Sequence, residues 1–219
     1  IDKWLLFGGS WGSTLALCYG IKYPENCLGF LLRGIFLGSE KEIDWFLIGM
    51  KKFFPEANRK FLSSLGFLNH ENPKKKEILN TSYSKLFNDD PEIHQPVANS
   101  WASYEMSCST LKYEDRKMTN SSSLAIARIE SHYFKNNCFL KPNEIINNLF
   151  KLKHKPFVIV QGRHDVICPP ISASILESYL PFAKLIMVEN AGHSAFEMGI
   201  KDALLNGMKY FKEILIDNK

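Results

Sequence analysis

The sequence predicts an α/β protein with a mainly parallel sheet and an inserted helical cap. Short continuous apolar runs alternate with helical patterns at both ends of the chain, whereas the middle shows helical spacing alone. In addition, three of the apolar runs end in a turn that holds a different reactive side chain. We therefore expect a core made of residues 1–38 and 151–219, with a cap over residues 39–150.

Composition narrows the possible partners. The 219 residues, 45% of them hydrophobic, can bury one core with an inserted unit. The net charge is +4, and much of it comes from local runs of basic residues such as Lys74–Lys76. We interpret this run as a solvated loop or helix start. No basic stripe with interleaved aromatics is present, and no apolar run approaches the ~20 residues of a membrane span. We expect neither nucleic acid nor membrane as a partner. No signal peptide is visible in the given residues, and a leader in the segment before Ile1 stays an open alternative.

The cysteines indicate a reducing compartment. Their number is odd, they are scattered and none forms a CxxC pair: Cys18, Cys27, Cys108, Cys138 and Cys168. This pattern argues against a disulfide framework and against a zinc site. The expected location is cytoplasmic, with no bound metal.

The first core segment has the pattern of a strand, a helix and a second strand. The run "WLLF" is typical of a central parallel strand covered on both faces. "STLALCYGIKY" has helical spacing and stops at Pro24, and "LGFLLRGIF" is a second buried-strand candidate. Such a unit builds parallel α/β sheets.

The middle segment lacks strand patterns. Aromatic and charged residues alternate at helical spacing in "EIDWFLIGMKKFF", "VANSWASYEMSC" and "SSSLAIARIESHYF". The loop "NHENPKKKE" interrupts them and has no expected catalytic part. This texture predicts a helical lid.

The last segment returns to the α/β pattern. "KPFVIVQGRHD" and "AKLIMVENAGH" predict strands that end in polar turns, with a helix in "PPISASILESYL" between them. A closing amphipathic helix is expected at about residues 195–214.

The turn after the first strand fits G-x-S-x-G, with Ser10 at its centre. A strand before this motif and a helix after it define a nucleophile elbow, in which the serine backbone is strained and its neighbours must be small. A plain strand–helix turn is the alternative.

The other two turns hold Asp165 and His193. Alone, the first would be a helix cap and the second a surface residue. However, the order serine, acid, histidine is that of the α/β-hydrolase triad, each member following a parallel strand. Ser10 would then be the nucleophile, His193 the general base and Asp165 its orienting acid, with the Trp11 N–H as an oxyanion donor. Arg33 and Arg163 are expected to partner carbonyls or carboxylates.

Several blocks give the chain a more specific resemblance. "FGGSWGSTLALCYGIKYPE", "LLRGIFL", "WASYE", "ARIESHYF", "QGRHDVICP" and "AGHSAF" together resemble the proline iminopeptidase family, over nearly the whole chain. The resemblance implies an α/β-hydrolase core with a helical cap, no cofactor, and a peptide with a free N-terminal proline as substrate. In this family an "HGGPG" segment and further strands precede the elbow. The chain lacks that segment, from which a second oxyanion donor would come.

The resemblance also implies substrate-binding residues. Glu105 and Glu130, on cap helices, would bind the amino group of the substrate, since a carboxylate compensates a desolvated cation and rejects blocked peptides. An apolar proline pocket would be lined by Phe36, Phe46, Phe134 and Cys168, with Trp45 nearby. Tyr104 replaces the second tryptophan of the family's W-x-x-W-E block.

Other functions stay open at this level. An esterase or a broader aminopeptidase could share the triad without the amine-binding carboxylates, and a decayed binding protein or an inactive fragment could share the fold. Epoxide hydrolases and dehalogenases need an aspartate nucleophile, which Ser10 excludes.

Overall fold

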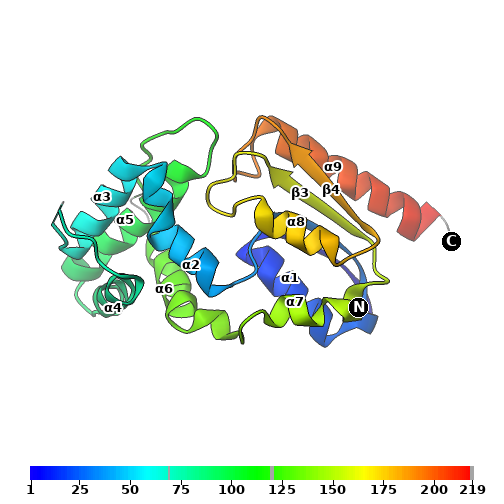
Figure 1. Cartoon of the computed structure of the whole chain (residues 1–219), viewed down its shortest axis with the longest axis horizontal. Helices are drawn as coiled ribbons and strands as arrows, with labels where there is room; N and C mark the ends of the chain where they lie inside the picture. The colour runs from blue at the N-terminus through cyan, green and yellow to red at the C-terminus, as the bar shows by residue number, and fades with distance from the viewer. Residues whose placement is uncertain (69, 119–120, 218–219) are drawn as a thin grey trace. The chain divides into compact units, whose positions relative to one another are not determined.

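The computed structural model describes residues 1–68, 70–118 and 121–217. The chain divides into two compact units, a core made of Ile1–Gly38 with Pro142–Lys219 and a cap made of Ser39–Lys141. The helices and strands of both are drawn in Figure 1.

The core unit contains all of the strands found in the described residues. Its strands and helices, in chain order, are β1 (Trp4–Ser10), α1 (Trp11–Lys22), η1 (Pro24–Asn26), β2 (Cys27–Ile35), α7 (Glu144–Asn148), η4 (Leu149–Leu152), β3 (Phe157–Gly162), α8 (Ile171–Ser178), β4 (Ala183–Val188), α9 (Met198–Lys212) and η5 (Glu213–Asp217). The alternation of strand and helix that the sequence predicts is confirmed.

The four strands form one parallel sheet in the order β1-β2-β3-β4. Because all strands run the same way, the turns after β1, β3 and β4 emerge at one edge of the sheet. In the centre, Phe30 of β2 lies opposite Phe157 of β3, and their rings stack with centroids 4.3 Å apart. The topology thus brings the three polar turns to the same edge.

Helices cover both faces of the sheet. On one face, α9 packs Ile200 and Phe211 into a core cluster with Leu31 and Val158 of the central strands. On the other face, Gly20 of α1 packs against the Phe30 ring, since successive strand residues point to opposite faces. Figure 1 shows α8 and α9 on opposite sides of β3 and β4.

The first strand differs from its prediction. "WLLF" has the pattern of a strand covered on both faces, but β1 pairs only with β2 in the described chain. Trp4 and Phe7 are therefore 44% and 63% exposed. The apolar run predicted a strand correctly, and within the described chain this strand lies at an edge of the sheet.

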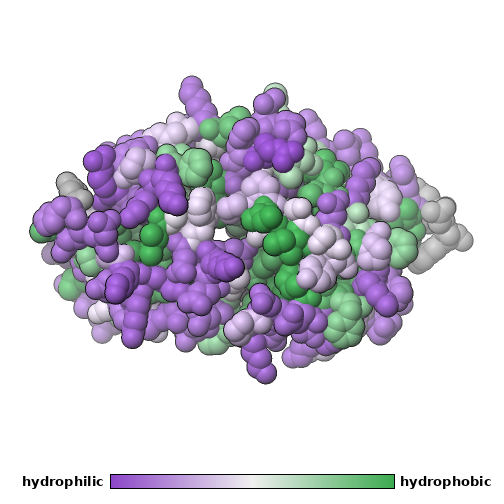
Figure 2. Space-filling view, in the orientation of Figure 1, coloured by the Kyte–Doolittle hydropathy of each residue, from purple (hydrophilic) through white to green (hydrophobic). Residues whose placement is uncertain are grey.

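The outer face of α8 is also apolar. Ile171, Ile175 and Tyr179 follow one another at helical spacing and remain exposed. Figure 2 shows hydrophobic side chains gathered over this part of the core unit.

Within its described residues the cap unit consists of helices and connecting loops, without a strand, as predicted. It consists of α2 (Glu40–Leu47), η2 (Gly49–Lys52), α3 (Pro55–Leu65), α4 (Lys75–Leu86), α5 (Pro91–Cys108), α6 (Ser121–Lys135) and η3 (Asn137–Phe139). The lysines after "NHENP" form the start of α4, which is one of the two alternatives expected for them.

Aromatic side chains form the interior of the cap. The rings of Phe61 and Tyr104 stack at 5.2 Å, and Trp101 meets Phe61 edge-on at 5.4 Å. Phe46 contacts Tyr104 and Phe134 edge-on at 5.6 and 5.5 Å. Offset and edge-on arrangements are the favoured ones for aromatic pairs, so this cluster holds α2, α3, α5 and α6 together.

The end of the cap unit along the chain differs from the expected one. The sequence places the end of the cap at residue 150, whereas the contacts place it at Lys141. Residues 142–150 carry α7 and the start of η4, which contact α1 and so belong to the core. The last helix likewise begins at Met198, after the expected start near residue 195.

Candidate active site

Ser10 occupies a strained turn between β1 and α1. Its φ of 56° and ψ of −126° lie in a region that L-residues rarely adopt. A Cβ atom at Gly8 would collide with the backbone of Gly12, where the strand passes the first turn of the helix. The elbow expected from G-x-S-x-G is therefore confirmed in its backbone and in its need for a small residue at position 8. At Gly12 a Cβ would meet no atom within 4 Å, so crowding does not explain that glycine.

Asp165 and His193 form a buried pair. Asp165 Oδ2 lies 2.8 Å from His193 Nδ1, and the two residues are 3% and 6% exposed. The backbone N–H of Cys168 donates to Asp165 Oδ1 at 2.8 Å, and the side-chain amide of Gln161 donates to Oδ2 at 3.0 Å. The carboxylate thus accepts three hydrogen bonds, one of which orients the imidazole.

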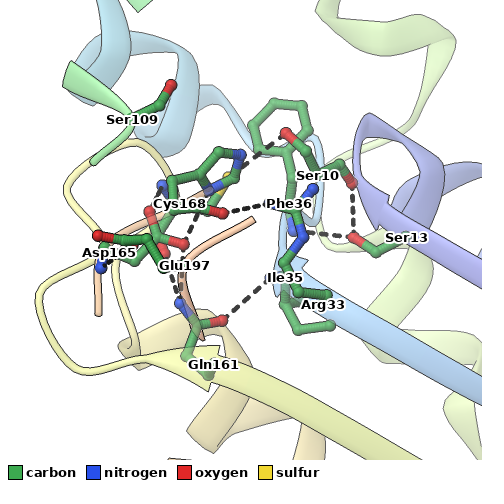
Figure 3. A network of polar contacts seen from close by, with 12 residues as sticks. Ser10, Ser13, Arg33, Ile35, Phe36, Ser109, Gln161, Asp165, Cys168 and Glu197 are labelled. Atoms are coloured by element: carbon green, nitrogen blue, oxygen red, sulfur yellow. Dashed lines mark hydrogen bonds and ion pairs between the residues drawn. The ribbon is translucent and has the colours of Figure 1, made fainter. Parts of the chain in front are cut away.

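The Ser10 hydroxyl lies 4.0 Å from Cys168 Sγ. Among the hydrogen bonds of the described residues, none joins Ser10 Oγ to His193. In unliganded hydrolases such catalytic contacts commonly tighten only when substrate binds. Figure 3 shows Ser10, Asp165 and Cys168 around one network of polar contacts.

The loop that carries His193 is held from both sides. Arg33 of β2 donates to the His193 carbonyl oxygen at 2.6 Å, and the Gly192 N–H donates to Glu197 Oε2 at 2.6 Å. Gly34 makes room for the ring: its φ is +53°, and a Cβ there would lie 2.9 Å from His193 Cε1. The expected structural roles of the arginines are confirmed, since Arg163 pairs with Glu189 at 2.9 Å.

Phe36 follows β2 and is locked to the elbow helix. The Ser13 hydroxyl donates to the Ser10 carbonyl at 2.7 Å and accepts the Phe36 N–H at 3.1 Å, while Thr14 donates to the Phe36 carbonyl at 2.6 Å. The Trp11 and Phe36 rings lie 6.4 Å apart. Phe36 is thus positioned beside the elbow.

Trp11 is the first residue of α1. The N–H groups of the first helical turn point toward the N-terminal end of the helix, where they favour negative charge. This arrangement suits the oxyanion role that the sequence suggests for the Trp11 N–H.

The cap brings two carboxyls together. Glu105 on α5 and Glu130 on α6 share a hydrogen bond, and the indole N–H of Trp101 donates to Glu130 Oε2 at 2.6 Å. Burial raises the pKa of the Glu130 carboxyl well above its ordinary value of 4.5, and the negative charge of Glu105 raises it further. The convergence that an amine-binding pair requires is present.

The other expected pocket residues fall in separate units. Phe46 and Phe134 belong to the aromatic cluster of the cap, Trp45 packs on the Phe53 ring beside them, and Cys168 is buried in the core.

Sequence reasoning missed several residues that shape the site: Ser13, Thr14, Gly34, Gln161 and Glu197. Only Gln161 left a signal, as a polar residue at the end of an apolar strand. In the part of the chain that the structure describes, no cluster of three His, Cys, Asp or Glu side chains could hold a metal ion. Among the described residues no disulfide joins any of the five cysteines. No described helix is long and apolar enough to cross a bilayer.

Comparison with known sequences gives a consistent result. A probable proline iminopeptidase from Leptolyngbya boryana is 39% identical over 96% of this chain and 66% of its own length. A proline iminopeptidase from Arabidopsis thaliana is 40% identical over 98% of this chain and 57% of its own length. The chain thus spans about two thirds or less of the length of these relatives.

Solved structures show the fold. An α/β hydrolase, MGS-M2, from a Medee basin deep-sea metagenome library has a TM-score of 0.55 at 16% identity, over 96% of this chain and 66% of that one. An esterase from Exiguobacterium antarcticum has a TM-score of 0.53 at 15% identity, over 95% and 66%. A family model described as the α/β hydrolase fold matches residues 1–199, and this chain therefore belongs to that family.

Proposed function

We propose that the full-length protein is a serine aminopeptidase that releases N-terminal proline from peptides through an acyl-enzyme on Ser10. The observation that carries the substrate class is the hydrogen-bonded pair of carboxyls formed by Glu105 and Glu130 on the cap helices. The hydrogen-bonded Asp165 and His193, together with the elbow at Ser10, support the reaction type. The similarity to proteins named proline iminopeptidase supports both.

In the acylation step, Ser10 Oγ attacks the carbonyl carbon of the substrate's proline, and His193 Nε2 accepts the hydroxyl proton. The oxyanion that forms accepts a hydrogen bond from the Trp11 N–H. Collapse of this intermediate breaks the peptide bond, and His193 returns the proton to the leaving amine. Water, deprotonated by His193, then hydrolyses the ester, which releases proline and restores the serine.

Asp165 acts on His193 throughout this cycle. Because its Oδ2 lies 2.8 Å from Nδ1, the carboxylate holds the proton of the imidazole on that nitrogen. Nε2 is then the basic atom, and the positive charge that it gains is stabilised by the same carboxylate. Neither a metal nor a cofactor is required for this chemistry.

The two carboxyls suit the amine of proline in particular. An N-terminal proline carries a secondary ammonium with two N–H donors, so each donor can meet one carboxyl. Acylation of that nitrogen removes both its charge and its N–H groups. We propose that Phe36, Phe46, Phe134 and Cys168 line the pocket for the ring, whose rigid apolar surface suits aromatic walls. Five cysteines that form no disulfide among the described residues support the proposal of a reducing, cytoplasmic setting.

A substrate panel tests the proposal. The full-length protein is assayed on chromogenic amides of proline, leucine and N-acetylproline, and on a simple ester. We expect kcat/KM for the free proline amide to exceed that for the acetylated one by about 100-fold or more, as for loss of a buried charge pair. Ester cleavage without a preference for free proline would retain the serine chemistry and refute the aminopeptidase.

A further inference from the structure

Gln161 stands at the carboxyl end of β3 and is fully buried. Its Nε2 donates to Asp165 Oδ2 and to the Cys168 carbonyl oxygen, both at 3.0 Å, and its Oε1 accepts the Ile35 N–H at 3.1 Å. Figure 3 shows Gln161 between the Asp165 loop and the end of β2. One side chain thus joins the loop that follows β3 to the end of β2, which is distant in sequence.

The amide of Gln161 has only one orientation that satisfies these partners. Both N–H donors face oxygen acceptors, and the carbonyl faces a backbone donor. A flipped amide would place its oxygen against a carboxylate and a carbonyl, and its NH₂ against the Ile35 N–H. Since all three groups are buried, the cost of that mismatch holds the side chain in place.

The orientation of the Gln161 amide restricts the Asp165 carboxylate. The Asp165 Oδ2 atom that receives the Gln161 amide is the same atom that lies 2.8 Å from His193 Nδ1. The other oxygen, Oδ1, is held by the Cys168 N–H. With a donor on each oxygen besides the histidine, the carboxylate cannot rotate about its Cβ–Cγ bond without breaking a hydrogen bond.

We infer that Gln161 is a positioning residue for the reaction, which sets the place of the Asp165 carboxylate and, through it, of the His193 imidazole. The inference rests on the serine mechanism proposed above. Through the Ile35 N–H, the same amide also ties the acid to the strand end that carries Phe36, whose peptide is held by Ser13 and Thr14.

Two variants of the full-length protein test this role. Gln161→Met keeps the length of the side chain and removes all three hydrogen bonds. Gln161→Glu keeps the acceptor for Ile35 and replaces the donor that faces Asp165. In both we expect kcat to fall about 10- to 100-fold, the effect of one hydrogen bond to a charged group, with KM changed by less than about threefold.

Val160→Ala is the matched control. Val160 precedes Gln161 on β3, and its buried side chain points into the opposite face of the sheet, in the cluster packed by α9. This variant weakens the core without touching Asp165, so kcat per folded site should stay within about twofold of the wild-type value. The end point of fluorophosphonate labelling counts folded sites, and an ester substrate makes the assay independent of proline specificity.

The downfield proton resonance of His193 Nδ1–H gives a readout that does not need turnover. We expect it to shift or broaden in Gln161→Met and to remain in Val160→Ala. Wild-type kcat per site with an unchanged resonance in both Gln161 variants would overturn the inference. The inference would also be overturned if kcat per folded site fell no further in the Gln161 variants than in Val160→Ala. If the wild-type serine is not labelled, the serine mechanism fails, and the resonance still decides whether Gln161 positions the pair.

Discussion

The two units of the molecule each bury a carboxyl group, and they treat it in opposite ways. In the core, Asp165 accepts hydrogen bonds from Gln161, from the Cys168 N–H and from His193. In the cap, Glu130 accepts the indole N–H of Trp101 and otherwise faces the carboxyl of Glu105. A buried charge is stable only where donors or cations meet it.

The difference agrees with the separate roles proposed for the two carboxyls. The core supplies Asp165 with its full set of partners before any substrate arrives, as a group with a fixed orienting task requires. Burial and the negative charge of Glu105 raise the pKa of the Glu130 carboxyl. A substrate cation bound beside the cap pair would favour its ionised form, which agrees with the role in recognition proposed for it.

The largest effect is expected in the core. Ser10→Ala removes the nucleophile, so kcat should fall about 10³-fold or more, toward the activity left to the rest of a triad site. Labelling by a fluorophosphonate, followed by mass spectrometry, should be lost as well. Ser178→Ala, an exposed serine of α8, serves as the control and should label normally. Retained labelling of Ser10→Ala would show that another residue is the nucleophile.

The cap pair should govern recognition. Glu130→Gln removes one partner of the substrate's ammonium, so kcat/KM for the proline amide should fall about 10²- to 10³-fold, mainly through KM. Hydrolysis of an ester without an amino group should change little. Glu92→Gln, on the exposed first turn of α5, is the matched control. An unchanged kcat/KM in Glu130→Gln would leave the cap pair with a structural role alone.

Two glycines with positive φ allow the effect of backbone strain on stability to be distinguished from an effect on kcat. Gly34 in the core and Gly66 in the cap both have positive φ, +53° and +97°. In Gly34→Ala the new Cβ also presses on the His193 ring, so we expect kcat to fall about tenfold or more together with ~1–2 kcal/mol of stability.

Gly66→Ala should cost ~1 kcal/mol of stability, because its Cβ would meet only Lys85 Nζ, at 3.8 Å. Its kcat should not change. Thermal unfolding and ester kinetics on both variants check this contrast, and equal kcat values would show that the ring of His193 tolerates the added methyl.

The smallest effect concerns pH. Because burial raises the pKa of Glu130, the folded chain binds that proton more tightly than the unfolded chain does. The resulting stability is complete below the ordinary carboxyl value of 4.5 and is lost as pH rises through the raised pKa. Relative to wild type, the Tm of Glu130→Gln should therefore increase across this range, by about 2–4 °C. Parallel Tm curves from about pH 4 to pH 8 would contradict the raised pKa.

Local patterns predicted the core because its chemistry is tied to strand ends. Ser10, Asp165 and His193 each follow an apolar run, and parallel strands bring such turns to one edge. The pattern of apolar residues did not predict features that depend on contacts with other segments, such as the place of a strand in the sheet. An apolar run such as "WLLF" identifies a strand and does not tell its place in the sheet, in which β1 is an edge strand within the described chain. The late start of α9 follows from Glu197, whose carboxylate is held by the Gly192 N–H.

The sequence by itself determined the class of the fold, the cap between two core segments and the order of the three reactive turns. These features depend on the period of apolar residues and on the need for small residues at a tight turn. Only the tertiary structure decided the convergence of Glu105 with Glu130, the space that Gly34 leaves for His193, and the three partners of Gln161. Most of these contacts join residues far apart in the chain, and a hydrogen bond or a pKa depends on distance and burial, which the order of residues alone does not specify.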